Sequence, residues 1–253
     1  MEKDLIAEMK ELVETGKKHG KVLKVSEVFG TYPVEEEVHK GELAYWKNKL
    51  PASLLEKYEI YNFNHAVEVL SQAYPAEYAD IIGALESFLL SVQDIVAGGG
   101  NESAIPKKLS AYLHPLDWQE VKITGDLLVK LHRRNPSQVT ELTIKDFIDG
   151  HNIDFVKNRV AVDMEWNSKD QTFDRDLYAF RTFYECGIIS CGVIITRSEK
   201  LNPVFDRLGV KKKYGASTTW MGKLLPRINS GRHGGCPLMV VGITPKAITD
   251  VEE

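Results

Sequence analysis

The sequence predicts an α/β fold in which a mixed central β-sheet is flanked by helices, with an N-terminal helical extension. Strand-like and helix-like stretches alternate in the second half of the chain, as expected for a sheet covered by helices. The last strand-like stretch, 238–243, is apolar throughout, which is typical of a strand buried on both faces. The 253 residues suffice for one large core with an appendage. We therefore expect an N-terminal extension over 1–55 and a main domain over 56–253.

The first half of the chain is predicted to be mainly helical. Apolar residues recur at helical spacing over 3–19, 64–73 and 75–96, and a further helix is expected over 35–50. Pro75 suits the first turn of its helix. The apolar stripe of 75–96 is wider than one core face needs, so this helix is the candidate for contact with a second copy. The pattern between 105 and 150 is the least regular.

In the second half, the stretch from Ile153 to Trp166 predicts two short strands joined at 157–159. Side chains alternate faces along a strand, so Asp163 and Glu165 point the same way. Asp154 lies at the end of the preceding strand. The remaining expected elements are a helix over 173–185 with a buried aromatic stripe, a strand over 188–196, short helices over 201–208 and 217–225, and the strand 238–243.

Three carboxylates, those of Asp154, Asp163 and Glu165, are thus expected to converge at one edge of the sheet. Such groups repel one another unless a cation lies between them, and a hard divalent ion such as Mg²⁺ prefers oxygen ligands. The alternative is that Asp-x-Glu simply marks the solvent face of an amphipathic strand.

Three stretches, IDFVKNRVAVDMEW (153–166), GVIITR (192–197) and RINSGRHGGCPLMVVGITP (227–245), resemble the BglII/BstYI family of type II restriction endonucleases. That family belongs to the PD-(D/E)xK nucleases, and the resemblance spans about 60–245. It implies that Asp154 and Asp163 bind metal. Nucleases of this superfamily often bring a helical Glu near the metal, so the resemblance also makes Glu86 a candidate for a further metal-site carboxylate, the alternative being a carboxylate at the rim. Glu165 stands where the superfamily usually has Lys, where BglII-like enzymes have Gln and where BamHI-like enzymes have Glu, so the usual catalytic Lys is missing here.

The resemblance further implies a restriction-endonuclease-like domain that cuts double-stranded DNA with one or two Mg²⁺ ions per active site. A homodimer would cut both strands of a palindromic site, for which relatives suggest a GATC core, and a cognate DNA methyltransferase would complete the system. Candidates for DNA contact are polar residues that follow the acidic strand or lie late in the chain: Asn167, Ser168, Lys169, Ser217, Thr218, Thr219, Arg227 and Arg232.

The resemblance leaves two other classes open, a PD-(D/E)xK nuclease of repair or recombination without a fixed site and a non-catalytic DNA-binding protein on the same fold. The net charge of −4 neither supports nor opposes DNA binding, because basic residues are clustered locally. No apolar run has the length of a membrane span. The three cysteines are few, odd in number and without metal-ligand spacing, so we expect a cytoplasmic protein with core cysteines.

Overall fold

The computed structural model describes residues 45–97 and 104–249, and it divides the chain into two compact units, 1–48 and 49–253. Of the first unit only 45–48 are described, so the account below concerns the second unit. The predicted helix over 3–19 and most of that over 35–50 lie outside the described residues.

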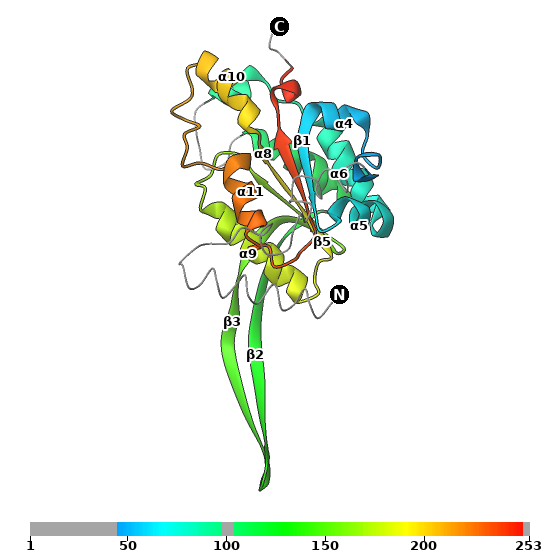
Figure 1. The fold of residues 1–253 in the computed structure, drawn as a ribbon, viewed down its shortest axis with the longest axis vertical. Coiled ribbons are helices and arrows are strands. Elements are labelled where there is room, and N and C mark those ends of the chain that lie inside the picture. The colour runs from blue at the N-terminus through cyan, green and yellow to red at the C-terminus, as the bar shows by residue number, and fades with distance from the viewer. Residues whose placement is uncertain (1–44, 98–103, 250–253) are drawn as a thin grey trace, which may run out of the picture. The chain divides into compact units, whose positions relative to one another are not determined.

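A six-stranded mixed sheet forms the centre of the second unit, in the order β1-β6-β5-β4-β3-β2 (Figure 1). β4, β5 and β6 are parallel to one another, whereas β1, β3 and β2 join by antiparallel pairing. The predicted mixed sheet is therefore confirmed. The strands are β1 (Tyr58–Phe63), β2 (Gln119–Arg134), β3 (Ser137–Lys157), β4 (Val160–Glu165), β5 (Cys191–Arg197) and β6 (Leu238–Ile243).

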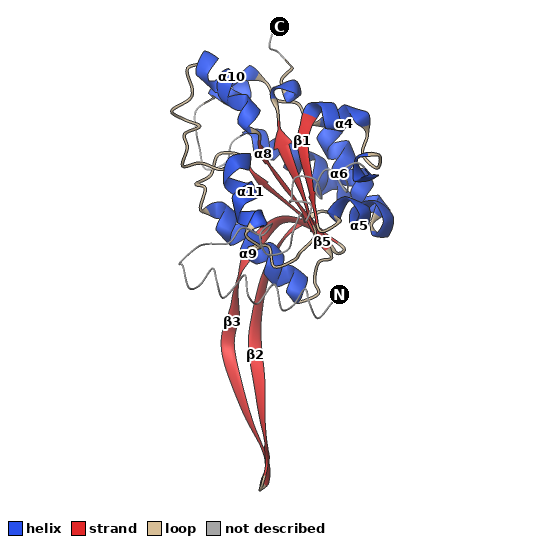
Figure 2. Ribbon diagram, viewed as in Figure 1, coloured by secondary structure: helices blue, strands red, loops and turns tan. Residues whose placement is uncertain are grey.

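Helices lie on both sides of this sheet (Figure 2). Every residue of β4, β5 and β6 is buried, as predicted for β6 from its apolar run. Of the buried stripe predicted for the helix over 173–185, Phe173, Leu177 and Phe180 are fully buried, whereas Tyr184 is half-buried. The helices are α4 (Ala52–Lys57), α5 (Ala66–Ala73), α6 (Pro75–Ser87), α7 (Val92–Val96), α8 (Ala104–Leu113), α9 (Thr172–Glu185), α10 (Asn202–Arg207) and α11 (Met221–Asn229). None of these described helices is long and apolar enough to cross a membrane.

The single helix predicted over 75–96 is wrong. Pro75 does begin α6, but α6 ends at Ser87, and Ser91 then caps the separate helix α7 in a capping box with Asp94. The apolar residues Ile81, Ile82 and Leu85 are buried within this chain. The segment therefore has no spare stripe for a second copy.

The helix predicted over 217–225 begins and ends four residues later, because residues 217–219 are held in backbone pairing with 168–170. The turn predicted at 157–159 is confirmed. Asn158 takes a positive φ of 50° there, and its amide donates a hydrogen bond to the buried Glu77 of α6. Lys157 pairs with Asp80 of the same helix at 2.8 Å, which fastens the β3–β4 hairpin to α6.

The region between 105 and 150 contains an extended hairpin that the pattern did not predict. β3 is 21 residues long, but it pairs with β4 only through Phe155–Lys157 and elsewhere only with β2. The two strands therefore continue beyond the rest of the sheet as a ribbon (Figure 1). We call its regularly paired outer part, Leu127–Arg134 with Ser137–Ile144, the arm. Register shifts mark its root, where a Cβ at Gly150 would lie 1.8 Å from the Ile123 carbonyl oxygen, so only glycine fits.

Candidate active site

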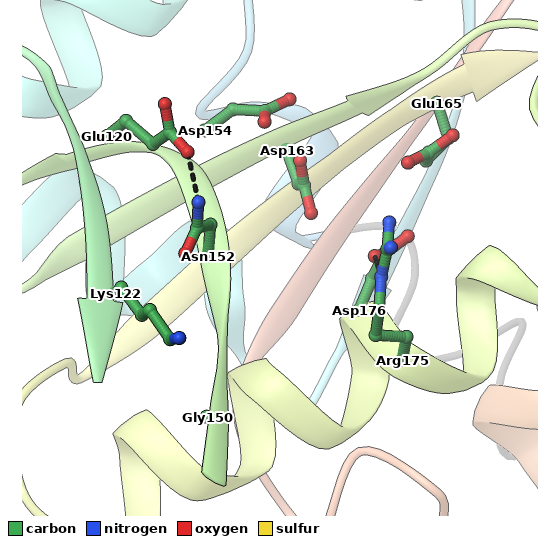
Figure 3. A pocket seen from close by; sticks show the side chains of 9 residues that line it. All are labelled: Glu120, Lys122, Gly150, Asn152, Asp154, Asp163, Glu165, Arg175 and Asp176. Atoms are coloured by element: carbon green, nitrogen blue, oxygen red, sulfur yellow. Dashed lines mark hydrogen bonds and ion pairs between the residues drawn. The ribbon is translucent and has the colours of Figure 1, made fainter. Parts of the chain in front are cut away.

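A polar cavity of about 390 Å³ opens at the root of the arm. β2 and β3 form one side of it, β4 forms its floor and α9 closes it (Figure 3). Nine residues line the cavity, five of them acidic: Glu120, Lys122, Gly150, Asn152, Asp154, Asp163, Glu165, Arg175 and Asp176. The structure thus brings all three carboxylates of the predicted site, Asp154, Asp163 and Glu165, to one place.

Asp154 and Asp163 are neighbours across the β3–β4 pair. Phe155 pairs with Val162, and the same register continued by one residue sets Asp154 opposite Asp163. Asp154 is exposed, whereas Asp163 is only 3% exposed. Burial, then the charges of Asp176 and Asp154, a hydrogen bond with Asp154 and the charge of Glu165 raise the pKa of Asp163 well above its ordinary value.

Asp176 is a fourth carboxylate of the site that the sequence analysis missed. It lies on α9, is 3% exposed, and contacts the guanidinium of Arg175 at 3.7 Å. Burial, with the charges of Glu165 and Asp154, raises its pKa to about 8 against the opposing effect of Arg175. A signal for it exists in the sequence: Asp176 follows Phe173 by three residues and precedes Phe180 by four, so an acid interrupts the buried stripe of the helix.

Glu165 lies further along β4, with its carboxylate turned toward Arg175 and Asp176 (Figure 3). Burial raises its pKa, a hydrogen bond from Ser168 lowers it, the charge of Asp154 raises it and that of Arg175 lowers it, and the net direction is upward. Two oxygens, Glu165 Oε2 and Asp176 Oδ2, are buried without a hydrogen-bond partner. An orphaned buried carboxylate oxygen is costly, which indicates that something further binds here.

The five acidic side chains that line the cavity offer carboxylate oxygens, which are the ligands that a hard divalent cation prefers. Over the described residues, however, no three His, Cys, Asp or Glu side chains are grouped closely enough to hold an ion as they stand. Binding an ion would therefore require these side chains to move toward one another.

Two cations line this acidic cavity. Arg175 is engaged by Asp176, whereas Lys122 comes from β2, opposite Asn152 of β3. Lys122 has no acidic partner within 4 Å among the described residues. The sequence analysis did not consider it, because no strand pattern was assigned to that stretch.

Glu86 lies outside the cavity. It is exposed at the end of α6 and accepts a hydrogen bond from Ser53 at 3.2 Å. Its proposed role as an extra metal-site carboxylate finds no support in this placement, and the rim alternative describes it better.

Six of the predicted DNA contacts lie in two loops, 167–169 and 217–219, that the structure holds side by side. Ser168 O accepts a hydrogen bond from Thr219 N at 2.8 Å, and Asp170 N donates to Ser217 O at 2.9 Å. Ser168, Lys169 and Ser217 are exposed, Thr218 is half-buried and Thr219 is fully buried. Thr219 therefore cannot contact a base as it stands.

A buried arginine that the sequence analysis did not single out supports these loops. Arg197, at the end of β5, is 1% exposed and packs over the rings of Phe205 and Tyr214 at 5.5 and 5.3 Å. Its guanidinium donates hydrogen bonds to Thr218 Oγ1 and to the Tyr214 carbonyl. Burial lowers its pKa to about 10, so it stays charged at neutral pH. On the first loop, the half-buried Asn167 donates to the Lys213 carbonyl at 3.2 Å.

The last two predicted DNA contacts are committed to bonds within the chain. Arg227 Nε donates to Asp174 Oδ1 at 3.0 Å, and Arg232 donates to the same oxygen. Arg227 is also mostly buried, with 16% of its side chain exposed. These pairs tie α11 and the segment after it to the start of α9. The Arg232 side chain remains 52% exposed, so its contact with DNA stays a prediction.

Comparison with protein-family models matches residues 58–243 to the family described as restriction endonuclease BglII/BglIII. The matched stretch contains the whole six-stranded sheet, the cavity and the paired loops. No curated protein gives a significant match.

Proposed function

The chain belongs to the restriction endonuclease BglII/BglIII family, and on that premise we propose that it is a type II enzyme. In this proposal it makes Mg²⁺-dependent double-strand cuts by phosphodiester hydrolysis at a short palindromic site with a GATC core. It acts as a homodimer in the cytoplasm, beside a cognate DNA methyltransferase. In this proposal residues 56–253 form the catalytic and DNA-binding domain, and residues 1–55 form an accessory extension.

The observation that carries the proposal is the gathering of four carboxylates from β3, β4 and α9 in one cavity with two cations beside them. A fold held together by its core alone gains nothing from burying Asp163, Glu165 and Asp176 near one another, since each raises the cost of ionising the others. Perturbed acids grouped in a cavity are typical of a catalytic site.

In the proposed reaction Asp154, Asp163 and Glu165 would hold the metal, and Asp176 would add a further carboxylate. When bound, Mg²⁺ supplies activation of the attacking water and neutralisation of charge on the phosphate. Lys122 and Arg175 bind the scissile phosphate at the mouth of the cavity, where cations stabilise the charge that develops in the transition state. Gly150 allows β3 to approach β2 closely at this point.

Sequence reading is assigned to the paired loops, because base edges are recognised by hydrogen-bond donors and acceptors. The predicted residues that keep this role are Asn167, Ser168, Lys169, Ser217 and Thr218. Thr219 is buried and Arg227 is mostly buried beside Asp174, so these two are assigned to support of the loops. Arg232 is half exposed beside Asp174 and stays a candidate for DNA contact.

The test is digestion of a fully sequenced phage DNA by the full-length chain, with Mg²⁺ and with EDTA, followed by sequencing of the fragment ends. The proposal expects discrete fragments, only with the metal, whose ends share one short palindrome containing GATC. Metal-dependent cutting without a shared sequence would instead identify a repair-type nuclease. Binding without any cutting would identify a non-catalytic DNA-binding protein.

Lys122→Met is expected to lower the single-turnover cleavage rate by roughly 10²-fold, because it removes the one cation of the described cavity that has no acidic partner. Lys169→Met is the matched control. Lys169 is exposed on the loop that pairs with Thr218 and lies outside the cavity, so its loss should weaken DNA binding and leave the rate at saturating enzyme unchanged. Equal rates for the two variants would remove Lys122 from the mechanism.

A further inference from the structure

The guanidinium of Arg197 carries a buried charge that has no acidic partner in the described chain. Its Nε atom is also buried without a hydrogen-bond partner. The rings of Phe205 and Tyr214 offset part of the desolvation through cation–π contacts. A buried charge without a counter-ion still opposes folding, and an apolar side chain of similar size would serve the core equally well. The charge is therefore better explained by its effect on the neighbouring loop.

That effect falls on the hydroxyl of Thr218, whose hydrogen bonds have only one possible direction. Arginine has no acceptor, so the Arg197 guanidinium must donate to Thr218 Oγ1. A carbonyl has no donor, so Thr218 Oγ1 must give its own proton to the Gly215 carbonyl, 2.7 Å away. A hydroxyl has one proton and two lone pairs, so a single lone pair is left. Toward any further partner Thr218 is therefore an acceptor and not a donor.

The backbone pairing of the two loops does not involve Arg197. Thr219 N donates to Ser168 O at 2.8 Å, and Asp170 N donates to Ser217 O at 2.9 Å. The exposed Ser217 hydroxyl makes no hydrogen bond within the part of the chain that is described, so it is free to rotate and to donate or accept. Arg197 thus adds to an already paired loop the control of one hydroxyl.

An acceptor recognises only some of the edges that bases present in the major groove. The exocyclic amino groups of adenine and cytosine donate hydrogen bonds there, whereas guanine O6 and N7 and thymine O4 accept them. A hydroxyl that rotates freely satisfies both kinds of edge, and one that only accepts distinguishes them. Thr218 is half-buried, so part of its side chain stays open to a partner.

We propose that Arg197 is a positioning residue that makes Thr218 an acceptor toward DNA, so that Thr218 recognises the exocyclic amino group of adenine or cytosine in the cleaved site. The inference rests on the proposed function, because it assigns a base contact within that reaction. Arg197 itself is buried and does not contact DNA. It removes the other orientation of the hydroxyl, so a base that presents an acceptor at this point leaves both groups unpaired and is rejected.

The experiment exchanges one amino group of the DNA at a time for a carbonyl oxygen. The full-length chain, in excess and with Mg²⁺, cuts the duplex found by fragment-end sequencing and companion duplexes that carry hypoxanthine for one adenine or uracil for one cytosine. The ratio of maximal rate to half-saturating concentration is measured for each duplex. The ratio on the parent duplex divided by that on a companion is the discrimination, and changes in the duplex itself cancel between protein variants.

At one base, the wild type should discriminate about tenfold more strongly than Thr218→Val, which lacks the hydroxyl. Thr218→Ser is the matched control, because it keeps the hydroxyl and should discriminate as the wild type does. Arg197→Met should lose the discrimination at the same base, because the hydroxyl can then turn and donate. The companion duplex that shows the effect identifies the base as adenine or cytosine.

The outcomes separate this inference from the proposed function. A wild-type chain that cuts no defined site refutes both. If it cuts its site but Thr218→Val or Arg197→Met discriminates as well as the wild type at every base, only the inference is refuted. Should Arg197→Met not fold, the comparison of Thr218→Val with Thr218→Ser still decides.

Hydrogen exchange without DNA distinguishes control of the hydroxyl from general support of the loops. The amides of Thr219 and Asp170 should exchange in Arg197→Met within about threefold of the wild-type rate, because their bonds join the loops without Arg197. Much faster exchange at these two amides would show that Arg197 holds the loops together as a whole, and would overturn the assignment to the hydroxyl.

Discussion

Asp163→Asn is expected to leave the fold and DNA binding intact while it lowers the cleavage rate by on the order of 10³-fold or more. Asn has almost the shape of Asp but carries no charge, and Asp163 is a buried acid of the cavity, in contact with Asp154 and close to Asp176. The measurement is single-turnover cleavage of a duplex that contains the site found by fragment-end sequencing, with enzyme in excess and Mg²⁺ present. Fluorescence anisotropy of the same duplex reports binding separately.

Glu86→Gln provides the matched control for this experiment. The sequence nominates Glu86 as a further metal-site carboxylate, whereas the structure places it on the surface beside Ser53. Removing its charge should therefore leave the rate unchanged. If Asp163→Asn cuts at a near-normal rate, or if Glu86→Gln loses as much activity, the cavity at the arm root is not the active site.

The central part of the sheet was predictable from local patterns. β4 alternates small or acidic residues with larger apolar ones, and β6 is apolar at every position, so each pattern follows directly from which faces are buried. The hairpin was not predictable in this way. Its outer part has no core to impose an alternation, and the register shifts between Gln119 and Leu127 break the phase of the pattern near its root.

The same distinction applies to the site. Asp163 and Glu165 share a face because they are two residues apart on one strand, and Asp154 is one short hairpin away, so all three follow from local geometry. Asp176 reaches them only because α9 packs across the sheet, which no local spacing predicts. Asp174 pairs with Arg227 and Arg232 for the same reason, and no local spacing predicts these pairs either.

Asp176→Asn is expected to stabilise the metal-free protein, by an amount that grows with pH. The pKa of Asp176 is raised from 3.8 to about 8 in the folded chain. Between these two values the folded chain holds a proton that the unfolded chain has released, so the free energy of unfolding of the wild type falls as pH rises through this window. The free energy of unfolding of the Asn variant lacks that dependence on pH. It should exceed that of the wild type only slightly below pH 4 and by about 2–4 kcal/mol near pH 7–8.

The companion variant Asp174→Asn should instead lower the free energy of unfolding at neutral pH. Burial works to raise the pKa of Asp174, but Arg227 and Arg232 outweigh it and hold the pKa below its ordinary value. Its charge therefore stabilises the fold above the ordinary pKa of 3.8, and that contribution is lost as pH falls through the depressed value. Urea denaturation of the wild type and both variants in EDTA, at pH 5, 7 and 8.5, measures the difference. If Asp176→Asn is no more stable than the wild type at pH 8.5, ionisation of Asp176 does not cost folding free energy. The buried acids of the cavity would then not oppose folding.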